Sequence, residues 1–462
     1  MLDSERLRAE QAVCDASLAE AGEGLEHLQL EFPGLDGMLR GKIVAAAKGM
    51  SASGMGLSSL TYSLIGGDNV ALTPWSDVDS GFPKFVATPD PATLVRWGWR
   101  EGIGAVLFDS VMPDGAPCGL DVRRTVRRLS DELAQRGFTA NVAYELEFYV
   151  FHADDTLLAQ GRHHELRPFG RSWDAYSLAR FPEWQDLGRE FTRRMASVGV
   201  SVEAFHTELG YGMYEFALSP AAPLAAADGA ARARLYLRQL CAEQGLVCTF
   251  MPKWRADRGD SGSGAHFHLS LARDGENVTW DAERQDLSQP GTQALAGMLA
   301  TMPELHAFFR PLVNSYRRMD AGSWNPEDAS WGYDNHIAAV RAITGPTPRH
   351  VHFEHRTSGA DASPYLAIAS LLTGVLHGLD QSLEPLPPCR GDPTAGGAYP
   401  RLPADLRASV AALRESAVAR RWLGDLLVDH FCDTRERECA DYEAWARTQV
   451  SRWELERYFE WA

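Results

Sequence analysis

Two pairs of metal-binding residue types, each spaced by one residue inside an apolar run, constrain this chain more than any other feature. The run AYELEFYVF contains Glu145 and Glu147, and the run SGSGAHFHLSL contains His266 and His268. Side chains at i and i+2 share one face of a strand, so each pair points one way while Leu146 points into a core. Adjacent carboxylates destabilise a strand face unless a cation compensates them, and a divalent metal is the natural compensator. The pattern predicts strands that line a metal site.

Taken alone, each pair fits an ordinary solvated strand face better than a metal site, so further residues are needed. Glu208 and Glu215 flank the turn ELGYGMYE, and Glu354 alternates with Arg356 in VHFEHRTSGADASPYL. Carboxylates that hold hard divalent ions, beside arginines that neutralise phosphoryl oxygens, are typical of phosphoryl-transfer sites. The candidate arginines are Arg318, Arg341 and Arg356. The chain has no GxxxxGK[ST] motif, so we expect a nucleotide site of another kind than the P-loop.

Length and composition predict a soluble globular protein of two domains. A chain of 462 residues exceeds one ordinary core, and 45% hydrophobic with 23% charged residues is typical of globular proteins. The net charge of −17 argues against nucleic acid or an anionic membrane as a partner. Seven cysteines without a CxxC motif favour a reducing cytoplasm. No apolar run reaches the roughly 18 residues of a membrane span.

The pattern of strands and helices divides the chain near residues 103–112. We assign residues 1–107 to a small N-terminal domain and residues 108–462 to a larger domain in which strands alternate with long helices. Asp121 is expected to cap a helix that stops at Gly137. Strands are expected over 139–151, 199–206, 247–252, 263–271 and 350–356, and helices over 223–244, 291–313, 364–379 and 403–422.

The stretches named above occur in the order found in glutamine synthetases, and the chain resembles that superfamily over most of its length. The matching stretches are AYELEFYVF, VEAFHTELGYGMYEF, TFMPKWRADRGDSGSGAHFHLSL, NSYRR and FEHRTSGADASPYLAIASLL, with WELERYFEWA at the C-terminus. The resemblance implies an α+β fold, in which a small N-terminal β-grasp domain joins a large catalytic α/β domain with an antiparallel-sheet funnel. It also implies a homododecamer of two stacked hexameric rings, each site being completed by the neighbouring subunit's N-terminal domain.

The resemblance further implies roles for individual residues. One metal site would use Glu147, Glu208 and Glu215, and the other Glu145, His266 and Glu354. Bound glutamate would be held by Gly262, Arg318 and Arg356. ATP would be met by Glu203, His268, Ser270 and Arg341. The implied cofactors are ATP and two or three Mg²⁺ or Mn²⁺ ions per active site.

The implied reaction joins the γ-carboxylate of glutamate to an amine at the expense of ATP. A free carboxylate reacts poorly with amines because its leaving group would be oxide, whereas phosphorylation makes phosphate the leaving group. An unprotonated amine then attacks the acyl carbon, and the developing negative charge is stabilised by Arg318, Arg341 and Arg356.

Two positions depart from the pattern of glutamine synthetases that use ammonium. The aspartate of the neighbouring N-terminal domain would fall in SLIG, residues 63–66, which contains no acid, and the flap glutamate is replaced by Trp324. Losing both carboxylates removes the preference for a small cation, while an aromatic ring offers apolar area and a cation–π face to an alkylammonium group. We therefore expect an amine pocket that includes Ser63 and Trp324; alternatively, Trp324 only packs the loop.

A small amine such as ethanolamine is the first choice, which predicts a γ-glutamylethanolamide synthetase. Polyamines such as putrescine come second, because no added acidic cluster would hold a distant ammonium group, although Glu327 and Asp328 weaken that argument. Further alternatives are an ammonium-using glutamine synthetase, a ligase for another carboxylate, and a non-catalytic assembly protein. The base that deprotonates the amine is not identified; the candidates are Asp68, Asp320, Glu327 and Asp328.

Overall fold

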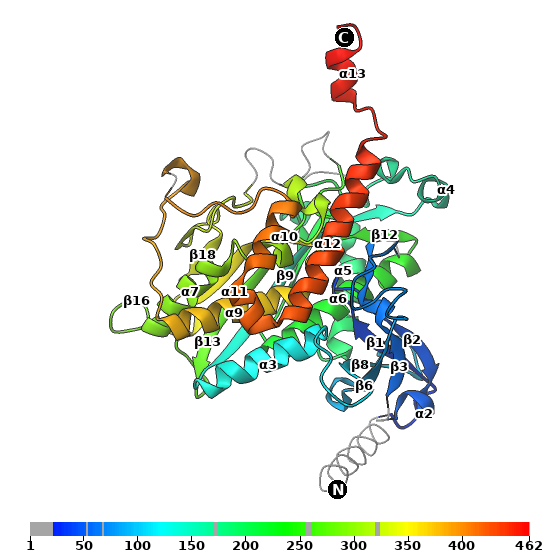
Figure 1. Ribbon diagram of the computed structural model, residues 1–462, viewed down its shortest axis with the longest axis horizontal. Coiled ribbons are helices and arrows are strands. Elements are labelled where there is room, and N and C mark those ends of the chain that lie inside the picture. The colour runs from blue at the N-terminus through cyan, green and yellow to red at the C-terminus, as the bar shows by residue number, and fades with distance from the viewer. Residues whose placement is uncertain are drawn as a thin grey trace.

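The structure is a computed structural model that describes residues 22–51, 54–66, 69–170, 174–255, 261–318, 324–396 and 398–461. Figure 1 shows a small sheet near the N-terminus, drawn in blue, beside a larger body of strands and helices. At the other end of the chain, helix α13 (Arg452–Tyr458) stands clear of that body.

The N-terminal sheet has the order β2-β1-β8-β6-β3, with β7 paired to β8. Its strands β1 and β8 are parallel, and the other pairs are antiparallel. One face is apolar because alternate residues such as Leu28, Phe85 and Val106 are buried in the core. The strands are β1 (His27–Pro33), β2 (Leu39–Ala45), β3 (Met55–Ser58), β6 (Lys84–Pro89), β7 (Val95–Arg96) and β8 (Ile103–Val111).

The larger sheet has the order β10-β11-β9-β13-β19-β18-β17 and is antiparallel except for the pair β17 and β18. The strand β12 (Leu246–Thr249) also pairs with β9. The seven strands of the main path are β9 (Thr139–His152), β10 (Val202–Thr207), β11 (Met213–Leu218), β13 (Gly264–Arg273), β17 (Trp331–Tyr333), β18 (Val340–Ile343) and β19 (His352–Gly359) within the described residues.

Helices cover one face of the larger sheet and leave the other free for polar residues. On β9, Tyr144, Leu146 and Phe148 are buried among these helices, so Glu145 and Glu147 point the opposite way. Helix α9 is buried along nearly its whole length, as its apolar sequence predicts. The covering helices are α3 (Val122–Gln135), α6 (Pro223–Glu243), α7 (Gln289–Thr301) and α9 (Pro364–Gln381).

Two of the expected helices are interrupted. The helix expected over 291–313 ends at Thr301, and the short helix α8 (His306–Phe309) follows, because Pro303 cannot continue a helix interior. The helix expected over 403–422 divides at Ser416, whose hydroxyl accepts from the backbone N–H of Ala419 and so starts a new helix. The two resulting helices are α10 (Leu406–Glu415) and α11 (Ala417–Leu423).

Buried ion pairs join the N-terminal sheet to the larger body. Glu31 on β1 accepts from Nε of Arg232 on α6 at 2.7 Å, and both side chains are buried. Arg123 on α3 contacts Asp109 on β8 and Asp228 on α6. The strand β8 belongs to the N-terminal sheet along its whole length, so we propose a domain division after residue 111 rather than at 107.

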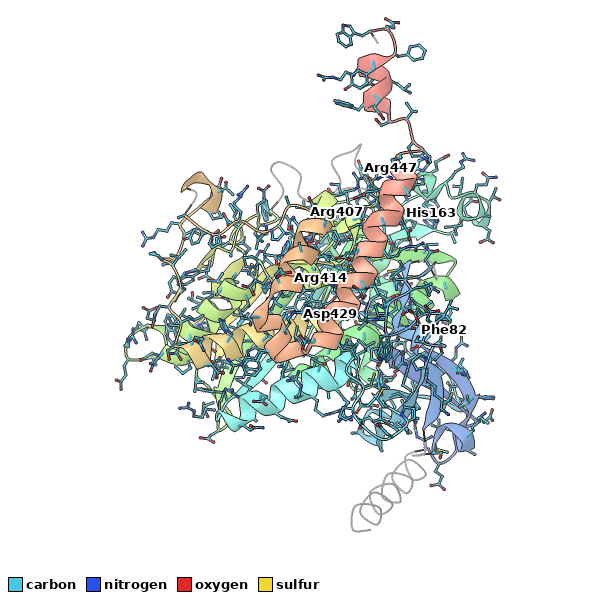
Figure 2. All side chains as sticks on the ribbon, in the orientation of Figure 1. Phe82, His163, Arg407, Arg414, Asp429 and Arg447 are labelled. Carbon is cyan, nitrogen blue, oxygen red and sulfur yellow. The ribbon has the colours of Figure 1, made fainter. Side chains whose placement is uncertain are left out.

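Charged pairs hold the C-terminal helices together. Figure 2 shows Arg414 on α10 and Asp429 on α12 (Asp425–Ala446) between these two helices. Arg414 also lies 2.8 Å from Asp433, and Arg407 pairs with Glu443 on α12. In the described part of the chain, no helix combines the length and the apolar character that crossing a membrane requires.

Candidate active site

The first acidic cluster lies where β9, β13 and β19 run side by side. The register pairs His266 with Glu145, and His266 Nδ1 lies 2.9 Å from Glu145 Oε1. The same nitrogen lies 3.4 Å from Oε1 of Glu354 on β19. One ligand atom from each of the three residues lies within 4.8 Å of the others, so a single cation could be bound by all three.

The second acidic cluster is formed by β10, β11 and the turn between them. His206 Nε2 lies 3.0 Å from Glu215 Oε1, and His206 Nδ1 lies 3.8 Å from Glu208 Oε1. Glu147 stands opposite Glu215 in the strand register. Sequence reasoning grouped Glu147 with the two other glutamates but missed His206. The signal was present, since His206 stands two residues before Glu208 in VEAFHTE.

The carboxylates of the two clusters have pKa values that are shifted in opposite directions. Burial, together with the charges of Glu145 and Glu147, raises the pKa of Glu215 to about 8, although a hydrogen bond from His206 opposes the shift. Burial and the charge of Glu147 also raise the pKa of Glu208. Although burial opposes it, hydrogen bonds from His266 hold the pKa of Glu145 low. Crowded, buried carboxylates that resist ionisation are a donor set that fits divalent cations.

Glycines beside the first cluster make room for Arg318. A Cβ atom on Gly262 would lie 2.5 Å from Cγ of Arg318, and one on Gly264 would lie 2.7 Å from its Nη2. The backbone N–H of Gly264 donates to Oε2 of Glu147. Gly262 was expected here from the sequence, whereas Gly264 was not, and any side chain at either position would displace the arginine.

The three arginines that were expected in the site face its carboxylates or lie beside them. Arg341 Nη1 donates to Glu354 Oε2 at 3.2 Å, Arg356 Nη1 donates to Glu354 Oε1, and Arg318 Nη1 donates to the carbonyl oxygen of Ser358 at 2.8 Å. The Nε–H of each arginine is buried and has no hydrogen-bond partner among the described residues. Buried cationic donors without partners favour an anionic ligand, as a carboxylate or a phosphate would be.

The residues expected to contact ATP are only partly brought together. His268 and Ser270 follow His266 on the same face of β13, and His268 Nε2 lies 3.3 Å from Glu145 Oε2. Glu203 is exposed on β10, and within the described residues no hydrogen bond or ion pair joins it to either cluster.

The flap that follows Arg318 presents Trp324 with 64% of its surface exposed. Buried Arg310 holds the next two residues, since its Nη2 donates to Asn325 Oδ1 at 2.8 Å and to the carbonyl oxygen of Pro326 at 3.1 Å. The backbone that follows Trp324 is therefore held in place, and the indole is largely exposed.

The other residues expected near the amine are placed less clearly. Ser63 is buried, and its hydroxyl has no hydrogen-bond partner among the described residues, so its part in an amine pocket stays a prediction. Glu327 pairs with Arg401 at 2.8 Å, and Asp328 is only 2% exposed. The two other candidate bases, Asp68 and Asp320, lie outside the described residues.

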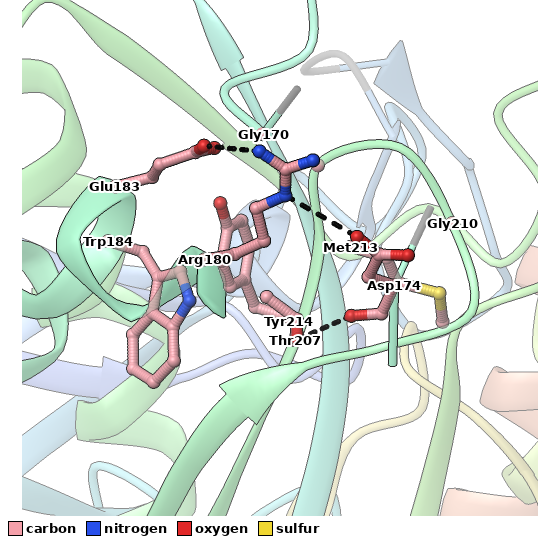
Figure 3. A pocket seen from close by; sticks show the side chains of 10 residues that line it. Gly170, Asp174, Arg180, Glu183, Trp184, Thr207, Gly210, Met213 and Tyr214 are labelled. Carbon is pink, nitrogen blue, oxygen red and sulfur yellow. Dashed lines mark hydrogen bonds and ion pairs between the residues drawn. The ribbon is translucent and has the colours of Figure 1, made fainter. Parts of the chain in front are cut away.

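A loop that sequence reasoning overlooked lies over the second cluster. The ring of Tyr176 lies 4.8 Å from that of His206, and burial, followed by the charges of Glu208 and Glu215, raises the pKa of its hydroxyl. Behind the loop is the pocket of Figure 3, where the Thr207 hydroxyl donates to the carbonyl oxygen of Asp174 at 2.7 Å. Arg180 bridges Asp174 and Glu183 in the same view. The loop is thereby fixed to the strand that carries His206.

Comparison with known proteins agrees with this arrangement. Residues 119–458 match the family model described as glutamine synthetase, catalytic domain. The chain is 32% identical to the γ-glutamylethanolamide synthetase of Streptomyces coelicolor, covering 96% of this chain and 94% of the relative. It is 31% identical to a glutamate–isopropylamine ligase of a Pseudomonas species, covering 94% and 95%.

A solved structure described as apo GmaS without ligand superimposes with a TM-score of 0.80 at 25% identity, covering 96% of this chain and 99% of the other. The expected α+β fold of glutamine synthetases is confirmed by this likeness. The sequence relatives include enzymes that join glutamate to organic amines. The chain therefore belongs to the glutamine synthetase family and is a glutamate–amine ligase.

Proposed function

We propose that this ligase joins the γ-carboxylate of glutamate to a small primary monoamine, with ethanolamine as the preferred substrate. The observation that carries the proposal is the exposed Trp324, at the position where the resemblance to ammonium-using glutamine synthetases implies a carboxylate. An exposed indole attracts an alkylammonium group through apolar contact and a cation–π interaction, neither of which favours the small, strongly hydrated ammonium ion.

The flap also disfavours polyamines. A diamine such as putrescine carries a second ammonium group that needs a free carboxylate at a distance from the first. The nearest acids among the described flap residues are unsuited to that role, because Glu327 is paired with Arg401 at 2.8 Å and Asp328 is buried. Both relatives reported above act, by their names, on monoamines.

The other substrates are assigned to the two clusters and the arginines. We propose that Arg318 and Arg356 hold the carboxylates of glutamate, with Gly262 and Gly264 giving access, and that Arg341, His268 and Ser270 face the phosphates of ATP. Glu203 stays a prediction as a contact of ATP. The two clusters would hold Mg²⁺ or Mn²⁺, and the bound ions would withdraw charge from the γ-phosphoryl group and orient the γ-carboxylate.

We further propose a homododecamer of two stacked hexamers in the cytoplasm, where ATP is available. The support from this chain is the C-terminal segment, which stands away from the body and exposes Trp453, Phe459 and Trp461. Large exposed aromatic side chains on one segment are typical of a surface that is covered in an assembly. Light scattering coupled to size exclusion would give a mass near twelve times 50.9 kDa.

Phosphate release with ATP, Mg²⁺ and glutamate tests the substrate. The amine panel comprises ammonium, ethanolamine, isopropylamine, putrescine, cadaverine and spermidine, with product masses measured for each. The highest kcat/KM is expected for ethanolamine, with little turnover of ammonium. Ammonium as the best substrate would refute the interpretation of Trp324, and a polyamine as the best substrate would refute that of the flap acids.

A further inference from the structure

We propose that His352 is a positioning residue that fixes the imidazole of His268, and through it the phosphates of the nucleotide. The proposal rests on the proposed function in one respect, namely that His268 faces ATP. His352 stands on β19, two residues before Glu354, and its Nε2 lies 3.1 Å from Nδ1 of His268 on β13. The centroids of the two rings are 5.1 Å apart.

The other side of the His352 ring is held by backbone. Its Nδ1 lies 2.6 Å from the carbonyl oxygen of His350. A carbonyl oxygen only accepts hydrogen bonds, so the proton of this contact belongs to Nδ1 of His352. His350 is itself tied to the preceding turn, because its Nδ1 lies 2.8 Å from Oγ1 of Thr347. The ring of His352 is therefore anchored, and its Nε2 is directed at His268.

His268 has one nitrogen on each side of its ring, and the two nitrogens have different neighbours. Nε2 points at the first acidic cluster, 3.3 Å from Glu145 Oε2, and Nδ1 points away from it to His352. Because the proton of the His352 ring lies on Nδ1, its Nε2 accepts from the Nδ1–H of His268. This contact would set the angle at which a His268 ring protonated on both nitrogens donates from Nε2 to a phosphate oxygen. A second contact of this kind commonly orients an active-site histidine.

The pairing of β13 with β19 brings His352 beside His268. Glu354 pairs with His268 across β13 and β19, which places His352 diagonally beside that histidine. On the other side, His352 is paired with Ile343 on β18, so no charged residue of that strand stands directly opposite it. The residues come from segments 84 positions apart in the chain.

Two substitutions of His352 test the contacts of its two ring nitrogens separately. The amide of glutamine reaches the place of Nε2, whereas the amide of asparagine reaches only the place of Nδ1. His352→Gln therefore keeps the contact to His268, and His352→Asn keeps only the contact to the His350 carbonyl. The affinity of each variant for ADP would be measured by calorimetry with Mg²⁺, and KM for ATP, glutamate and ethanolamine by phosphate release.

The expected result is that His352→Asn weakens ADP binding and raises KM for ATP about tenfold, the effect of one lost hydrogen bond in a buried site. His352→Gln is expected to stay within about twofold of the unaltered protein, and KM for glutamate should change in neither variant. In a His268→Ala background, His352→Asn should have no further effect on ADP binding.

Four results would overturn the proposal. Equal weakening by both substitutions would mean that His352 contacts the nucleotide itself, and no weakening by either would mean that it has no role there. A rise of KM for all substrates would indicate a general structural defect. Because ADP binding needs no amine, the proposal can succeed even if ethanolamine is not the substrate, and it fails if the unaltered protein does not bind ADP.

Discussion

Replacement of Glu215 by glutamine should stabilise the metal-free protein at alkaline pH and weaken its binding of divalent ions. Glu215 is buried beside two other carboxylates, Glu145 and Glu147, and its pKa is raised to about 8 from an ordinary value of 4.5. The neutral amide of glutamine resembles the protonated carboxyl group in shape. The substitution therefore removes a charge that the fold tolerates only when a cation is present.

The sign of the pH dependence follows from proton binding. Between pH 4.5 and about 8, the folded protein keeps a proton on Glu215 that the unfolded chain has released. The free energy of unfolding contributed by this group is fully present below pH 4.5, falls as pH rises through the interval, and is lost above about pH 8. The difference between these two pKa values corresponds to at most about 5 kcal/mol in the free energy of unfolding.

The glutamine variant has no such loss of stability. Its Tm should therefore exceed that of the unaltered protein slightly at pH 5 and most at pH 9. For a chain of 462 residues, 1 kcal/mol corresponds to about 1 °C in Tm, so the advantage at pH 9 should reach about 5 °C at most. Calorimetric scans in EDTA at the two pH values, at equal scan rates, measure this difference. Titration with Mg²⁺ should then raise Tm of the unaltered protein more than that of the variant.

The exposed Glu283 offers a matched control, since Glu283→Gln removes one charge without affecting either cluster. This variant should have the same Tm as the unaltered protein under all conditions. The reasoning is refuted if Glu215→Gln melts at or below the unaltered protein at pH 9 in EDTA. An equal gain of Tm from Mg²⁺ in both proteins would refute the assignment of Glu215 to a metal site.

Three further predictions concern the amine and Gly264. Trp324→Glu restores a carboxylate to the flap and should raise kcat/KM for ammonium relative to ethanolamine about tenfold, measured in the phosphate-release assay. Arg401→Ala frees Glu327 and should raise kcat/KM for putrescine relative to ethanolamine several-fold; an unchanged ratio would mean that the ion pair does not limit the choice of amine. Gly264→Ala should lower kcat at least about 100-fold, because its Cβ would lie 2.7 Å from a guanidinium nitrogen, whereas Gly56→Ala, with nothing within 4 Å, should retain activity.

The sequence by itself determined the strands and the faces of the site. The i, i+2 spacing placed Glu145 with Glu147 and His266 with His268, since successive side chains on a strand alternate whatever their surroundings. Asp121 caps α3 as expected, because a cap depends on residues only three positions apart. Local geometry of this kind can be predicted from the sequence, and motifs that resemble those of a known family can be identified in it.

Contacts between distant segments were decided only by the tertiary structure. His206 joined the second cluster through the pairing of β10 with β11, and the burial of Ser63 is a property of the folded chain. Glu327 is paired with Arg401, which lies 74 positions further along the chain. The physical reason is that strand register, burial and charge compensation depend on which segments contact each other in the folded chain. The spacing of residues along the sequence does not determine those contacts.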